Sequence, residues 1–110
     1  MAYDERLADR IRDLLIHVPN LTEKKMFGGI GWMIGGHMAT GASSKGGLIV
    51  RCSKADHGGL LAEPGAGGFG KSGKPMSGWV VVQPEFVDDE ADLARWVGLG
   101  RAYAESLPPK

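Results

Sequence analysis

The sequence has one cysteine, no net charge and no long apolar run, and each absence excludes a class of protein. Because Cys52 is alone, neither an internal disulfide nor a multi-cysteine metal site can form. Thirteen basic and thirteen acidic side chains cancel, so the overall positive field that draws proteins to nucleic acids or anionic membranes is missing. No stretch approaches the roughly 18 consecutive apolar residues of a membrane span, and the N-terminus is charged and amphipathic, unlike a signal peptide. We therefore expect a cytoplasmic protein without a membrane partner.

The residue spacings of metal sites and nucleophilic active sites are also missing. His17, His37 and His57 form no i, i+4 pair. No serine occupies a G-x-S-x-G nucleophile elbow, and four of them are typical turn residues: Ser43, Ser44, Ser72 and Ser77. We expect no catalytic residues, no metal site and no cofactor.

Glycine, in contrast, is abundant, and residues 65–72 match the phosphate-loop pattern G-x-x-x-x-G-K-[ST]. A working phosphate loop follows a buried strand and opens a helix, so that backbone amides converge on the phosphates. Here Pro64 precedes the motif, and Gly73-Lys74-Pro75 cannot begin a helix directly after Ser72. We interpret the match as chance, and a small nucleotide-binding enzyme is the least favoured alternative.

Apolar periodicity predicts an α+β fold of two layers, an antiparallel sheet with helices on one face, in the order α-β(3-4)-α-β-α. The leading helix covers about residues 3–17, with Asp4 as its cap. Residues 24–38 predict a glycine-punctuated strand pair, with positive φ or a bulge at Gly28-Gly29 and a hairpin turn at Gly35-Gly36. The remaining expected elements are strands at 38–42, 48–52 and 78–83, a short helix at 54–63 that frays or breaks at 57–59, a loop at 64–75 and a helix from 89 to 107.

Two basic groupings are candidates for binding. Lys24 and Lys25 precede the first glycine pair, and Lys71 and Lys74 lie in the glycine-rich segment. If the fold brings them together with Arg51, they form a local positive patch that can contact phosphates or an acidic partner surface.

Several segments, in order along nearly the whole chain, resemble the N-terminal domain of the TfoX/Sxy family. They include Met26-Phe27-Gly28-Gly29, Gly73, Pro75-Met76, Gly78-Trp79 and Trp96-Val97. The resemblance implies one domain over residues 1–110, a fold like that of secretion chaperones, and a link to regulators of bacterial competence. Longer members carry a second, C-terminal helical domain of a kind associated with nucleic-acid binding, and this chain stops at Lys110.

We therefore expect a non-enzymatic regulatory or interaction module that acts by binding a protein, since a small two-layer domain with a free sheet edge can receive a partner strand. The same edge makes a homodimer an alternative. A nucleic-acid-binding regulator that uses the lysine and arginine patch is the second reading.

Overall fold

The structure is a computed structural model that describes residues 3–26, 28–69 and 77–108. Three α-helices, a short 3-10 helix and six strands follow one another in these residues. Their bounds are α1 Glu5–Leu15, β1 Leu21–Met26, β2 Gly29–Ile34, β3 His37–Ala42, β4 Leu48–Arg51, α2 Lys54–Leu61, β5 Ala66–Gly68, β6 Trp79–Val82, η1 Pro84–Val87 and α3 Glu90–Ser106.

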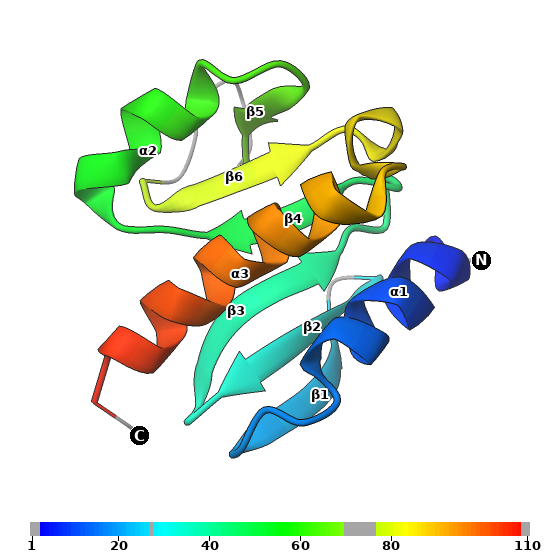
Figure 1. Ribbon diagram of the computed structural model, residues 1–110, viewed down its shortest axis with the longest axis vertical. Coiled ribbons are helices and arrows are strands. Elements are labelled where there is room, and N and C mark those ends of the chain that lie inside the picture. Colours follow the sequence, from blue (N-terminus) through cyan, green and yellow to red (C-terminus); the bar gives the residue numbers. More distant parts are fainter. Residues whose placement is uncertain (1–2, 27, 70–76, 109–110) are drawn as a thin grey trace.

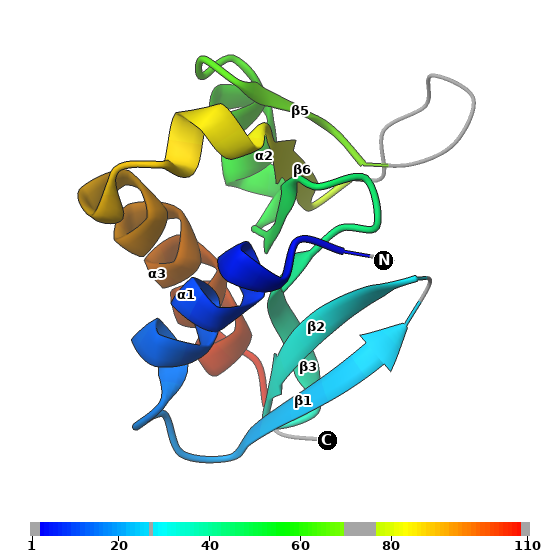
Figure 2. The same cartoon turned by 90° about the vertical axis from the view of Figure 1, so that its right-hand side faces the viewer.

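All six strands form one antiparallel sheet in the order β1-β2-β3-β4-β6-β5. Helices α1 and α3 lie side by side across one face of this sheet (Figures 1 and 2). The predicted fold class, an α+β fold with helices packed on an antiparallel sheet, is confirmed.

Asp4 caps helix α1 as the sequence predicts, and the helix is two residues shorter at each end than the expected range of about 3–17. The Asp4 carboxylate accepts hydrogen bonds from the backbone N–H groups of Arg6 and Leu7, at 3.0 and 3.1 Å. This satisfies two donors that have no partner inside the helix. Leu7, Ile11 and Leu15 are buried on one side of the helix, because their spacing places them on a single stripe facing the sheet.

The first three strands form two tight hairpins. Gly28, in the first turn, has φ 76°, and Gly35 and Gly36, in the second, have φ 60° and 87°. Two successive positive φ values are those of a type I′ turn, which matches the twist of the paired strands. The glycine turns are confirmed. The bulge lies elsewhere, in β3: Trp32 pairs with Thr40 but Met33 pairs with Met38, which leaves Ala39 as the extra residue.

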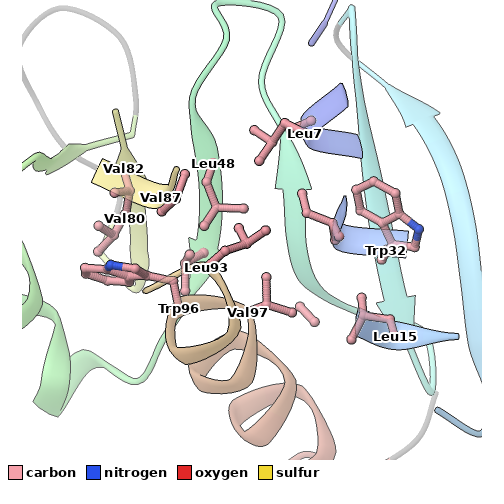
Figure 3. Close-up of a cluster of buried hydrophobic side chains, with 14 of the residues drawn as sticks. Leu7, Leu15, Trp32, Leu48, Val80, Val82, Val87, Leu93, Trp96 and Val97 are labelled. Carbon is pink, nitrogen blue, oxygen red and sulfur yellow. The ribbon is translucent and has the colours of Figure 1, made fainter. Parts of the chain in front are cut away.

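The core lies between the sheet and the helices (Figure 3). Leu48 of β4 and Val80 and Val82 of β6 alternate with residues on the opposite face, and each is fully buried. They face the apolar stripe of α3, whose buried side chains include Leu93, Trp96 and Val97. Asp89 caps α3 by accepting a hydrogen bond from the N–H of Ala91, as the acidic run before the helix predicted.

Two local predictions are wrong. Helix α2 runs without a break through Gly58 and Gly59. It is held at both ends, since Ser53 caps its start and Leu60 is buried against the core. The expected loop at 64–75 contains strand β5, which pairs with β6 at the far end of the sheet. Backbone pairing with a strong neighbouring strand forms β5 in a segment that has no apolar period.

Candidate functional site

Strand β1 is one edge of the sheet, at the opposite end from β5 (Figure 1). Its four central residues, 22–25, are all exposed. In the described part of the chain, no backbone hydrogen bond reaches residues 21–26 from any element other than β2. One side of this six-residue strand is therefore unpaired.

The register shows which backbone groups are unpaired. The N–H of Gly35 donates to the carbonyl of Asn20 at 3.1 Å, and these two residues extend the β1–β2 pairing by one position beyond Leu21. Hydrogen-bonded and non-hydrogen-bonded pairs alternate in an antiparallel ladder. The backbone groups of the even-numbered residues of β1 therefore bond to β2. The N–H and C=O groups of Leu21, Glu23 and Lys25 point outward from the edge, away from β2.

Glu23 fixes this edge strand to helix α1 and to the core. Its carboxylate oxygen Oε1 accepts hydrogen bonds from Nε of Arg12, at 2.7 Å, and from the indole Nε1–H of the buried Trp32, at 3.0 Å. The hydrogen bond from Arg12 is the largest cause of the lowered pKa of Glu23. Because the Arg12 guanidinium also lies over the Trp32 ring, 5.8 Å from its centroid, the three side chains form one cluster.

The two lysines of β1 lie on opposite faces of the sheet. Lys25 is paired with the buried core residue Ile30, so it is on the helix-covered face at the edge, and Lys24 is paired with Gly31 on the other face. The two lysines of the pair therefore lie on opposite faces of the edge strand.

Arg51 is not part of a patch with these lysines. It ends β4, and β2 and β3 lie between β4 and β1. Three strand spacings separate β1 from β4 by about 14 Å. Lys71 and Lys74, the other members of the predicted patch, lie outside the described residues.

The guanidinium of Arg51 instead lies over two aromatic rings. Its guanidinium carbon is 4.8 Å from the centroid of the Trp79 ring and 5.4 Å from that of Tyr103. The ring of Phe69 lies 6.0 Å from that of Trp79. The sequence predicts Arg51 as a binding residue but gives no signal for Tyr103, because 52 positions separate the two and only the packing of α3 on the sheet brings them together.

The phosphate-loop match lies only partly within the described residues. Residues 66–68 of the match are strand β5, and residues 70–72 lie outside the described residues. No group of three or more potential metal ligands occurs among the residues that the structure describes. Nor is any helix there both long enough and apolar enough to cross a membrane.

A pocket of about 560 Å³ lies between the start of α1 and the start of α3. Its lining carries charges of both signs, and one of its two arginines, Arg10, is already bonded. Arg10 donates to the carboxylate of Glu90 and to the carbonyl oxygens of Val87 and Asp88 at 2.8, 2.8 and 3.0 Å. These contacts join α1 to the η1–α3 connection, and they favour no class of ligand.

The family model for the TfoX N-terminal domain matches residues 13–104 of the 110-residue chain. The chain belongs to the TfoX N-terminal domain family. This membership indicates a regulatory, competence-related domain. Comparison with curated proteins and comparison with solved structures each found no match.

Two of the glycines that carried the resemblance to the TfoX N-terminal domain shape the backbone. A Cβ on Gly29 would overlap the carbonyl oxygen of Ala42, and Gly78 has φ 88° where the chain enters β6. Met26 and Trp79 are the strand residues next to these turns. Other residues of that resemblance lie outside the described residues: Phe27, Gly73, Pro75 and Met76.

Proposed function

We propose that this TfoX N-terminal domain is a non-enzymatic regulatory module that acts by binding a protein, and that the β1 edge receives an extended segment of that partner. The observation that carries this proposal is the unpaired row of backbone groups on Leu21, Glu23 and Lys25. Main-chain hydrogen bonds from such an edge supply affinity for an added strand, and neighbouring side chains supply specificity.

The contacts that hold β1 in place support the binding of a partner strand at this edge. Arg12 and Trp32 hold the Glu23 side chain, so β1 is positioned before a partner arrives. An edge that is already ordered loses less conformational freedom on binding. The exposed ammonium groups of Lys24 and Lys25 favour a partner segment with acidic side chains.

The test replaces Lys25 by proline and, as a matched control, by alanine. Lys25→Pro removes one outward N–H group without removing a bond of the β1–β2 ladder, and proline is tolerated on edge strands. Lys25→Ala removes the same side chain but retains the N–H. Both variants should unfold at nearly the same temperature as the wild type, as followed by circular dichroism.

Each protein is then used to capture partners from a lysate of the source cells, with and without nuclease. The proposal predicts a protein that the wild type and Lys25→Ala retain after nuclease treatment and that Lys25→Pro loses. Equal capture by Lys25→Pro would contradict the role of the edge. Recovery that disappears with nuclease would favour the nucleic-acid alternative instead.

A further inference from the structure

Arg51 is the end residue of β4, and the aromatic residues around it come from two other elements. Trp79 is its direct register partner on β6, and Tyr103 lies near the C-terminal end of α3. The guanidinium lies over both rings, 4.8 and 5.4 Å from their centroids. A cation is attracted to the face of an aromatic ring, so both rings restrain the position of the guanidinium.

The guanidinium N–H groups of Arg51 have no acceptor in the described part of the chain. Four of the other arginines, Arg10, Arg12, Arg95 and Arg101, each form an ion pair with a carboxylate there, but the side chain of Arg51 forms no ion pair and donates no hydrogen bond to a described residue. The residues outside that part include no aspartate or glutamate.

These donors are nevertheless accessible to a ligand. Arg51 is only partly buried, and no buried side-chain nitrogen is left without a partner among the described residues. Part of the Arg51 side chain therefore reaches solvent. A guanidinium that rests on aromatic rings and has solvent-accessible N–H groups can still offer two parallel donors.

We propose that Arg51, Trp79 and Tyr103 form a binding site for an oxyanion with two acceptor oxygens, a carboxylate or a phosphate group. The planar guanidinium matches such a pair of oxygens, and these charge-assisted bonds are the stronger kind in proteins. Because the rings already restrain the donor, little side-chain entropy is lost when the anion binds. This site extends beyond the proposed function and does not depend on the β1 edge, which lies three strand spacings away.

The test is a titration of the whole chain with sodium phosphate and, separately, with sodium acetate at constant ionic strength. NMR follows the Nε–H signal of Arg51 and the indole N–H signal of Trp79. We expect both signals to shift and to saturate with at least one anion. Saturation with phosphate alone assigns the site to phosphate groups, and saturation with acetate alone assigns it to carboxylates.

Variants separate this role from a purely structural one. Arg51→Lys keeps the positive charge but removes the two parallel N–H donors of the guanidinium. The anion should therefore bind about tenfold more weakly. The matched control, Arg101→Lys, changes an arginine that is already paired with Glu105, and it should leave the titration unchanged. Tyr103→Leu removes one of the two rings and should also weaken binding. Shifts of the Trp79 signal that never saturate with either anion, or equal affinity in Arg51→Lys, would overturn the proposal.

Discussion

Gly100 of α3 lies directly against the backbone carbonyl of Ala39, the extra residue of the β3 bulge. A methyl group added to Gly100 would overlap that carbonyl oxygen, and Gly100 is itself buried. The missing side chain therefore allows the helix to approach the sheet closely at the position of the bulge.

Gly100→Ala should destabilise the protein by about 1–3 kcal/mol, because α3 or β3 must move to remove the overlap. Gly98→Ala is the matched control on the same helix. Gly98 is exposed and an added Cβ would contact nothing there, so this change should stabilise the protein by up to about 1 kcal/mol through helix propensity. Urea denaturation of both variants measures the free energies of unfolding, and a neutral or stabilising Gly100→Ala would contradict the close approach.

The two glycines in α2 should be replaceable. Gly58 and Gly59 have no atom near an added Cβ, so alanine at each should raise the free energy of unfolding by about 0.5–1 kcal/mol. Gly78→Ala is the contrasting change, since φ is 88° there and alanine should destabilise the protein. Thermal denaturation compares the three variants. A loss of stability in Gly58→Ala and Gly59→Ala would show that these glycines do more than complete the helix.

The cluster around Glu23 predicts a specific pH dependence. The hydrogen bond from Arg12 is the main cause that lowers the pKa of Glu23 below its ordinary value of 4.5. A carboxyl group with a lowered pKa stabilises the folded state above its ordinary pKa, and this contribution is lost as the pH falls through the folded-state pKa. The side chains of Arg12 and Glu23 are 40% and 39% exposed, so solvent screening limits the effect to about 0.5 kcal/mol.

Glu23→Gln should therefore be less stable than the wild type at neutral pH, and the difference should close below pH 4.5. Urea denaturation across this range measures it. Asp13→Asn, which changes an exposed acid with no ion pair in the described part of the chain, is the control and should show no such trend. A constant difference at every pH would mean that Glu23 acts through packing rather than through its charge.

Cys52 should behave as a core residue. It is 4% exposed, and burial raises the pKa of its thiol. Because the thiolate is the reactive form, a disulfide reagent such as DTNB should label the native protein far more slowly than the urea-unfolded chain. Equal labelling rates in the two states would contradict the burial of this thiol.

The sequence predicted most of the fold because local signals and tertiary packing agree in most elements. The stripe of Leu7, Ile11 and Leu15 and the paired turn glycines are examples. The sequence does not predict an element correctly where strand pairing or tertiary packing outweighs the local conformational preference of the residues. Strand β5 has almost no apolar residues and forms because β6 offers a free edge, and α2 passes through Gly58 and Gly59 because both of its ends are held.

The site was harder to predict, because it depends on strand order. Lys24, Lys25 and Arg51 look equivalent as basic residues in the sequence, but two strands separate β1 from β4. The outward direction of the backbone at Glu23 and Lys25 depends on the register with β2. The contact of Arg51 with Tyr103 requires the placement of α3. No local pattern contains that information.

Strand addition at β1 is tested most directly by amide hydrogen exchange of this strand, alone and in complex with the captured protein. If the edge receives a strand, the outward amides of Leu21, Glu23 and Lys25 should exchange more slowly in the complex. The amides of Thr22 and Lys24, which already bond to β2, should change much less. Unchanged exchange at Glu23 and Lys25, with protection on another surface, would contradict the account.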